Sequence, residues 1–407
     1  MPPINNRWQP SALTPMTTMS SVESEYPAET STNYCCLNTL NFNQLTLQFA
    51  SSASYIASVA LFGDILLAGS SSELILSFDR SALLAEEAEV ARLLNASFSS
   101  SGKAGAVKSL AALPDRGILF SAHQDRKIRV WRDRPGDEGL SRIATMPTLA
   151  DRTLGFLSPR RDRVRRHVTS TWVCHADAIS ALALSGDGMF LYSVSWDRSM
   201  KIWRTSDFKC LESMANAHND AINAVVASYG GEVYTGSSDG MIKQWRKNKD
   251  DNKHAVAVTL ESHRSAGVNA LAMSRDESIL YSGGSDGVIS SWRIDYGETE
   301  LNSTLTGHGS SVLCLGTTSS NLLASGSADK TIRVWRSGVS HCTNGRFAKV
   351  MHTCVRVLEG HGGPIKCLVA ATVVDEGGAD DATHVVVYSG GLDSELKVWR
   401  VSVPTTS

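Results

Sequence analysis

The sequence predicts an all-β protein, a β-propeller of seven blades with four antiparallel strands in each blade. Four tryptophans, Trp203, Trp245, Trp292 and Trp335, are spaced 42, 47 and 43 residues apart, which is the period expected of a four-stranded blade. In six places an Asp stands six residues before a Trp and follows a run of alternating apolar and polar residues: Asp125/Trp131, Asp197/Trp203, Asp239/Trp245, Asp286/Trp292, Asp329/Trp335 and Asp393/Trp399.

Each repeat also carries a hydroxyl residue four positions before its Asp, and in the last five repeats a His opens the first strand. A buried carboxylate, imidazole, hydroxyl and indole N–H each need a partner, and these four groups can supply one another. Blades three to seven each carry the complete set, a tetrad of candidate structural residues: His175, Ser193, Asp197, Trp203; His218, Thr235, Asp239, Trp245; His263, Ser282, Asp286, Trp292; His308, Ser325, Asp329, Trp335; His361, Ser389, Asp393, Trp399. Their recurrence at one spacing argues against a catalytic or metal site, which would be unique in the chain.

The first two blades and the end of the chain depart from this pattern. Blade two has Ser121, Asp125 and Trp131, but Lys103 stands where the His is expected. Residues 55–78 predict a degenerate blade one, in which Glu73 replaces the Asp and Phe78 replaces the Trp. The last blade ends near residue 403 after its third strand, so we expect the alternating run at residues 45–49 to add the fourth strand and close the ring, which would otherwise have an open edge.

These spacings resemble the WD40 repeat over residues 44–401. Two segments, Ala122–Trp131 and Met146–His167, resemble a narrower group, the plant JINGUBANG-like WD40 proteins. An Arg after each repeat Trp adds to that likeness: Arg132, Arg204, Arg246, Arg293, Arg336 and Arg400. The resemblance implies a seven-bladed propeller in which each Asp, His, Ser/Thr and Trp set is hydrogen-bonded, and a non-enzymatic regulator of a plant cell.

The expected organisation has two parts. Residues 1–40 are rich in Ser, Thr and Pro and predict a disordered segment, and residues 41–403 predict the propeller. An insertion at 133–170 separates blades two and three, and a loop insertion at 372–383 interrupts blade seven. The outer strand of blade two is either residues 141–146, which puts the insertion on the face that carries the His residues (the top face), or residues 168–173, which puts it on the opposite face.

Residues 81–95 combine strong helix formers with an apolar stripe and predict a helix on the outside of blade one. His341, Cys342, His352 and Cys354 do not have the spacing of a structural zinc site, so no metal is expected. Residues 352–358 are expected to form an outer strand instead.

The bulk properties exclude several classes of protein. The formal charge is −2, with 20% charged and 42% hydrophobic residues, an ordinary composition for a soluble domain. The eight cysteines are scattered without a Cys-x-x-Cys motif, which indicates free thiols in a reducing compartment. We find no apolar run long enough for a membrane span and no signal peptide. We therefore expect a cytoplasmic or nuclear protein that is not secreted.

Two features predict a partner-binding surface. The first is the arginine run of the insertion, which is a docking arm, an import signal or a phosphate contact, or else a solvated loop: Arg160, Arg161, Arg163, Arg165 and Arg166. The second is the top rim around the central axis, with Trp196, Gln124, Leu392, Arg264 and Asp177 as candidates. Trp196 is either packed under a neighbouring loop or exposed as an anchor, since Trp is frequent at binding hot spots.

The sequence thus favours a non-enzymatic scaffold or adaptor that binds other proteins as a monomer, without a cofactor or a membrane. One alternative is a substrate receptor of a cullin-type ubiquitin ligase, but the Trp-Asp-x-Arg motif of such receptors is missing. Another alternative is a nucleic-acid-associated factor, which we consider unlikely because no aromatic residues are interleaved with the arginines to stack on bases.

Overall fold

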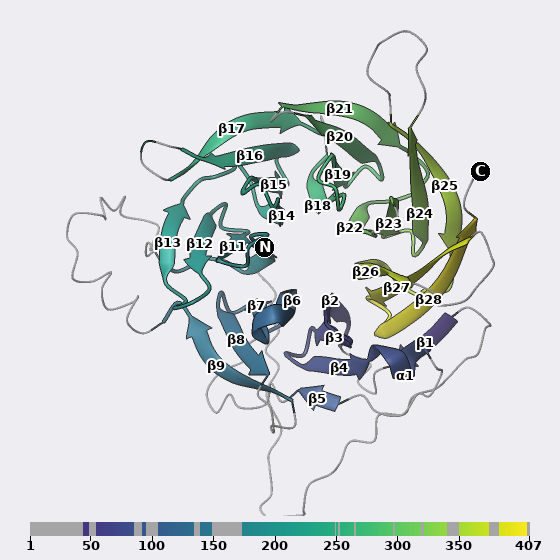
Figure 1. Cartoon of the computed structure of the whole chain (residues 1–407), viewed down its shortest axis with the longest axis horizontal. Coiled ribbons are helices and arrows are strands. Elements are labelled where there is room, and N and C mark those ends of the chain that lie inside the picture. The colour runs from purple at the N-terminus through teal and green to yellow at the C-terminus, as the bar shows by residue number, and fades with distance from the viewer. Residues whose placement is uncertain are drawn as a thin grey trace, which may run out of the picture. The chain divides into compact units, whose positions relative to one another are not determined.

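The computed structural model is a ring of seven four-stranded antiparallel sheets (Figure 1). It describes residues 44–48, 54–84, 92–94, 105–133, 139–148, 173–248, 250, 253–263, 266–295, 298–318, 321–339, 350–373 and 382–404. The first strand of each blade lies nearest the central axis and the fourth forms the outer rim (Figure 1). The predicted seven-bladed propeller is therefore confirmed.

The strands of the first four blades follow the chain in order from the axis outward. They are β2 (Ile56–Phe62), β3 (Ile65–Ser70), β4 (Ile75–Asp79), β5 (Arg92–Leu94); β6 (Val107–Leu113), β7 (Ile118–His123), β8 (Ile128–Asp133), β9 (Leu140–Met146); β10 (Ile179–Leu184), β11 (Phe190–Ser195), β12 (Met200–Arg204), β13 (Cys210–Met214); β14 (Ile222–Ala227), β15 (Val233–Ser237), β16 (Met241–Lys247), β17 (His254–Glu261). A short 3₁₀ helix, η1 (Pro114–Arg116), joins β6 to β7.

Blades five and six follow the same order, and blade seven takes its outer strand from the other end of the described chain. The strands are β18 (Val268–Met273), β19 (Ile279–Gly284), β20 (Ile289–Asp295), β21 (Glu298–Leu305); β22 (Val312–Thr317), β23 (Leu322–Ser327), β24 (Ile332–Val339), β25 (Val350–Leu358); β26 (Ile365–Val373), β27 (Ala382–Gly391), β28 (Glu395–Pro404), β1 (Gln44–Gln48). The outer strand expected at residues 352–358 is β25.

The ring is closed by β1, which pairs antiparallel with β28 from Gln44↔Trp399 to Gln48↔Glu395. The predicted closure by an N-terminal strand is therefore confirmed. A buried ion pair supports the joint, because Lys397 Nζ on β28 lies 3.0 Å from Thr46 Oγ1 and 2.9 Å from Glu395 Oε2. Closure removes the exposed edge that β28 would otherwise present.

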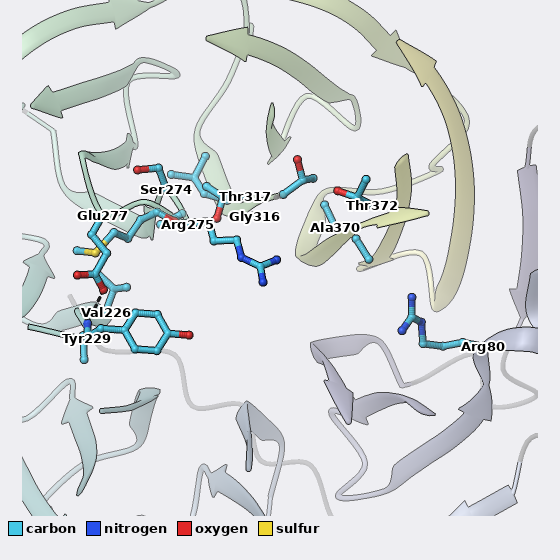
Figure 2. Close-up of a pocket in the computed structure, with 16 residues that line it drawn as sticks. Arg80, Val226, Tyr229, Ser274, Arg275, Glu277, Gly316, Thr317, Ala370 and Thr372 are labelled. Carbon is cyan, nitrogen blue, oxygen red and sulfur yellow. Dashed lines mark hydrogen bonds between the residues drawn. The ribbon is translucent and has the colours of Figure 1, made fainter. Parts of the chain in front are cut away.

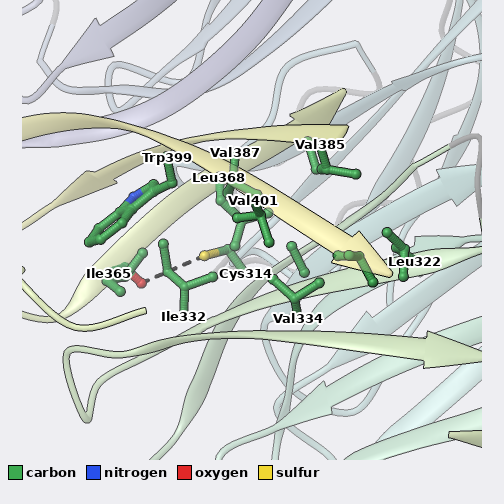
Figure 3. Close-up of a cluster of buried hydrophobic side chains, with 13 residues drawn as sticks. Cys314, Leu322, Ile332, Val334, Ile365, Leu368, Val385, Val387, Trp399 and Val401 are labelled. Carbon is green, nitrogen blue, oxygen red and sulfur yellow. Dashed lines mark hydrogen bonds between the residues drawn. The ribbon is translucent and has the colours of Figure 1, made fainter. Parts of the chain in front are cut away.

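The apolar core is distributed between blades. The described residues form seven hydrophobic clusters, and each cluster joins two neighbouring blades. Figure 3 shows the cluster between blades six and seven, in which Trp399 and Val387 pack against Ile332 and Val334. In each of blades two to seven the repeat Trp faces the preceding blade, and Phe78 takes that place in blade one.

The helix predicted at residues 81–95 is confirmed at residues 81–84 and is wrong at residues 92–94. The helix α1 spans only Arg80–Leu84, where Asp79 Oδ1 accepts hydrogen bonds from the backbone N–H groups of Ser81 and Ala82. Residues 92–94 form β5, which pairs with β4. The strand is favoured over a longer helix because β4 would otherwise be an open edge. Residues 85–91 lie outside the described part of the chain.

The outer strand of blade two is β9 (Leu140–Met146), the first of the two alternatives. The insertion therefore belongs to the connection that also holds His175. Residues 149–170 of the first predicted insertion and residues 374–381 of the second lie outside the described residues, as do residues 1–40. Within the described chain no helix is long and apolar enough to cross a membrane.

Candidate functional site

The predicted tetrad residues come together in blades three, four, six and seven. In blade seven His361 Nδ1 lies 2.7 Å from Asp393 Oδ2, His361 Nε2 lies 2.7 Å from Ser389 Oγ, and Trp399 Nε1 donates to the same oxygen at 2.8 Å. The other three blades repeat this geometry with distances of 2.8–3.3 Å. In each of these blades the series of hydrogen bonds runs from the Asp at the top face to the Trp that packs between blades.

The Asp of each of these tetrads also holds the backbone of the top face. Its carboxylate accepts a hydrogen bond from the backbone N–H directly after the His: Ala176, Asn219, Gly309 and Gly362. Burial opposes ionisation, but the hydrogen bonds from Thr331 and His308 lower the pKa of Asp329 to about 2. Burial also lowers the pKa of His175, His218 and His308. In blades three, four and six the tetrad therefore holds an ionised Asp beside a neutral His at pH 7.

Blade five differs from this prediction in one bond. His263 Nδ1 lies 2.9 Å from Asp286 Oδ2, but the hydroxyl of Ser262 lies 2.8 Å from Ser282 Oγ in place of the imidazole. His263 Nε2 is buried without a hydrogen-bond partner among the described residues. A Ser directly before the His supplies a second hydroxyl at this point, so the complete tetrad predicted for blade five is wrong.

Blade two replaces its missing His from another strand. His123 lies on β7, two residues before Asp125, and its Nε2 is 2.8 Å from Ser121 Oγ, which also accepts from Trp131 Nε1 at 2.8 Å. Burial, with the charge of Arg129, lowers the pKa of His123 to about 3. Arg129 in turn pairs with Asp125 at 2.9 Å. We missed this substitution, although a His at this position in the one blade without an opening His is a readable signal.

The alignment predicted for blade one is wrong by one residue. Leu66 pairs with Phe78 as Leu119 pairs with Trp131 in blade two. Six residues before Phe78 stands Ser72, so Ser72 holds the Asp position and Glu73 the next one. Glu73 has φ 76°, and its Oε1 accepts from the backbone N–H of Gly105 in blade two at 2.7 Å. Glu73 therefore joins two blades.

One group of described side chains, His361, Asp393 and Glu395, is close enough to hold a metal ion. All three already have partners, since His361 bonds Asp393 and Glu395 pairs with Lys397. The geometry of this group is that of a structural tetrad.

The top face presents exposed apolar and polar side chains on several blades. Trp196 is 42% exposed in the turn between β11 and β12, and Lys108 Nζ lies 5.0 Å from the centroid of its ring. Leu392 is 46% exposed in the corresponding turn of blade seven. Gln124 and Asp177 are also exposed on this face, although Asp177 Oδ1 accepts from the N–H of Ala178. Arg264 and the five insertion arginines lie outside the described residues.

The structure adds Lys108 and Lys366, which our sequence reasoning missed. Both follow the first residue of an inner strand, at the point where the pairing with the second strand shifts by one residue. Burial lowers the pKa of Lys108, and the positive charge of Lys366 lowers it further. The sequence signal that could have identified them is their position as the second residue of an inner strand, where a β-bulge changes the direction of the side chain.

Comparison with known proteins gives one family. The repeat described as WD domain, G-beta repeat, matches residues 94–132, 166–204, 208–246, 255–293, 299–336 and 352–400, more than half of the chain. Each matched segment ends within the third strand of one of blades two to seven.

Similar proteins include two described as Ribosome biogenesis protein WDR12 homolog. The one from Oryza sativa subsp. japonica is 24% identical over 168 residues, 40% of this chain and 37% of that protein. The one from Trichoplax adhaerens is 27% identical over 273 residues, 57% of this chain and 54% of that protein. Striatin-4 of Mus musculus is 33% identical over 142 residues, 34% of this chain and 15% of that protein. The chain thus spans about half or less of these relatives.

Proposed function

Because the chain belongs to the WD40-repeat family, we propose that it is a non-enzymatic scaffold that binds other proteins through the top face of its propeller. The roles of the described side chains support the proposal. The tetrad groups that resemble catalytic residues bond to one another and maintain the blades. Trp196, Leu392 and the two lysines have no comparable structural task. We also propose that the chain belongs to the narrower group of plant JINGUBANG-like WD40 proteins, which its sequence resembles.

The observation that carries the proposal is the exposed Trp196 with Lys108 beside its ring. An exposed Trp offers a large apolar contact area, and Trp is enriched at the centres of protein interfaces. The turn that holds Trp196 is rigid, because Asp197 beside it bonds His175 and the N–H of Ala176. A preorganised anchor loses little conformational entropy on binding. The site is therefore ready for a partner before the partner arrives.

The charges of the site define the partner further. Lys366 is exposed, and neither Lys108 nor Lys366 makes an ion pair with a described acidic residue. Cationic side chains without an acidic partner bind an acidic group favourably, because the charges at the interface are then complementary. The favoured partner is an acidic protein segment with an apolar side chain that covers Trp196.

A second candidate is association with ribonucleoprotein particles during ribosome assembly, in the nucleus. It is favoured by the names of two similar proteins, which are described as ribosome biogenesis proteins. It would also use the lysines of the top face and the arginine run of the insertion, because cationic side chains bind a phosphate backbone. Binding of this kind weakens steeply with salt, which separates it from the first candidate.

The test is a comparative pull-down from plant-cell extract with purified full-length chains, with and without nuclease, read by mass spectrometry. The baits are wild type, Trp196→Ala, the double variant Lys108→Glu/Lys366→Glu, and Leu301→Ala. Leu301 is 55% exposed on the outer strand β21, so its variant removes comparable apolar surface away from the top face. Each bait is first checked for an unchanged melting temperature.

We expect a discrete set of proteins that survives nuclease, that Trp196→Ala and the lysine variant lose, and that Leu301→Ala keeps. If the set is instead lost with nuclease and with the lysine variant alone, the second candidate replaces the first. If Trp196→Ala keeps every protein that wild type captures, the top-face site is wrong.

A further inference from the structure

We propose that the opposite, bottom face of the propeller binds a small molecule with several phosphate groups, held in the axial pocket between Arg80 and Arg275. The pocket has a volume of about 630 Å³ (Figure 2). That volume lies in the range of small-molecule sites, roughly 300–1,000 Å³. The proposal concerns a different face from the top-face site and does not depend on it.

The pocket is formed where the inner strands of four blades end. Residues of β14, β18, β22 and β26 and of the turns that follow them line it, and Arg80 of blade one is the one lining residue from outside these four blades. The wall that the strands supply consists mostly of small side chains such as Ala227, Ala272, Gly316 and Ala370. Small side chains leave the volume of the pocket open, and longer side chains from the turns extend into it.

Two guanidinium groups extend toward the pocket from separate blades. Figure 2 shows Arg275, in the turn between β18 and β19, and Arg80, directly after β4, on different sides of it. Arg80 Nη1 donates to the carbonyl oxygen of Gly63 at 3.3 Å, and Arg80 Nε is buried without a partner. Neither guanidinium makes an ion pair within the described part of the chain. Unpaired cations at a concave site attract an anion.

The acidic residue of the pocket does not neutralise these cations. Glu277 is the only acid among the described lining residues, and its Oε1 accepts a hydrogen bond from the backbone N–H of Tyr229 (Figure 2). The carboxylate therefore serves to fix the turn of blade four to the turn of blade five. The net charge at the pocket stays positive.

Tyr229 supplies a third group in a fixed position. Its side chain is 78% exposed, and Figure 2 shows its ring directed toward the pocket. On its other side the ring packs on Gly186 of blade three, where a Cβ atom would overlap it. The ring is thus held by blade three and the backbone by Glu277 of blade five. A preorganised hydroxyl with no partner among the described residues is available to donate to a ligand oxygen.

The arrangement favours phosphates over a single carboxylate. Arg binds phosphate through two parallel hydrogen bonds, which gives both affinity and orientation. Two guanidinium groups on different sides of the pocket require anionic oxygens at both ends of the ligand. A compact polyphosphorylated molecule meets that requirement, whereas one carboxylate reaches only one arginine.

The test is isothermal titration calorimetry of the full-length chain with inorganic tripolyphosphate as the probe and hexaglutamate as the carboxylate comparison. We expect one tripolyphosphate per chain. Arg275→Ser and Arg80→Ser should each weaken binding about tenfold or more, since each removes charge-assisted hydrogen bonds. Tyr229→Phe, which keeps the ring on Gly186, should weaken it a few-fold. Arg356→Ser is the matched control, because Arg356 is an exposed arginine on the outer strand β25.

Binding that Trp196→Ala leaves unchanged separates this site from the top face. Arg275 is exposed, so its variant should keep the wild-type melting temperature and carries the test even if Arg80→Ser is less stable. The proposal is overturned if tripolyphosphate does not bind, if Arg356→Ser weakens it as much as Arg275→Ser does, or if hexaglutamate binds as tightly as tripolyphosphate.

Discussion

Replacement of His123 by Ala should destabilise the propeller more than most single substitutions. His123 is 1% exposed, and its neutral imidazole bonds the hydroxyl of Ser121, which in turn accepts from Trp131. His123→Ala leaves the Ser121 hydroxyl without its acceptor, at a cost of about 1–3 kcal/mol. The cavity left by the ring adds roughly 2–3 kcal/mol, at the lower end of large-to-small core substitutions. Together we expect a loss of about 3–6 kcal/mol.

The assay is urea denaturation at pH 7, followed by tryptophan fluorescence, with Gln124→Ala as the control. Gln124 is the next residue and is exposed, so its variant should stay within about 0.5 kcal/mol of wild type. If His123→Ala loses no more stability than Gln124→Ala, then His123 does not replace the missing tetrad His and our interpretation of blade two is wrong.

Three further predictions follow from buried groups. Burial lowers the pKa of His123 to about 3 from 6.5, so below pH 6.5 the unfolded chain binds a proton that the folded chain does not. The free energy of unfolding should therefore fall by about 1.4 kcal/mol per pH unit as the pH drops from 6.5 toward 5. The fall should be smaller in His123→Ala. Equal urea midpoints at pH 7 and 5 would contradict this. Gly391→Ala should lower the free energy of unfolding by about 1–3 kcal/mol, because a Cβ there would lie 2.5 Å from Asp393 Oδ1. Thermal melting checks this against Gly309→Ala, which has nothing within 4 Å of its Cβ and should lower the melting temperature less. The double variant Thr46→Pro/Leu47→Pro removes a donor from the pairing of β1 with β28, because one of two neighbouring residues on an antiparallel edge strand donates to its partner and Pro has no N–H. Hydrogen exchange at the β28 amides should therefore rise; unchanged exchange would mean that β1 does not close the ring.

The repeats could be predicted because their residues are local and periodic. The Asp to Trp spacing lies within one hairpin, so the sequence alone places both residues on neighbouring strands. The seven blades and the closure by an N-terminal strand follow from counting strands and from the cost of an open edge. The alignment of blade one was wrong by one residue because this blade has neither the Asp nor the Trp that marks the register elsewhere, and only the pairing of Leu66 with Phe78 fixes it.

The helix predicted at residues 81–95 was wrong at residues 92–94 for another reason. Residues 81–95 have strong helix propensity, but propensity is worth only a fraction of a kcal/mol per residue and tertiary pairing overrides it. The unpaired edge of β4 takes residues 92–94 as β5. His123 was missed because its role depends on space that the absent tetrad His leaves open, and the same position is Gly391 in blade seven, where a Cβ would meet His361.

The amino-acid sequence by itself determined the repeat, the number of blades and the residues of most tetrads, because each tetrad is coded at fixed short spacings. Only the tertiary structure decided how blades meet. It placed Lys108 over Trp196, and Arg80 and Arg275 around one pocket. These groups come from different blades, and closing the ring brings together residues whose separation along the chain carries no local pattern. The fold can therefore be predicted from the sequence, whereas the surfaces proposed for binding form only when the ring closes.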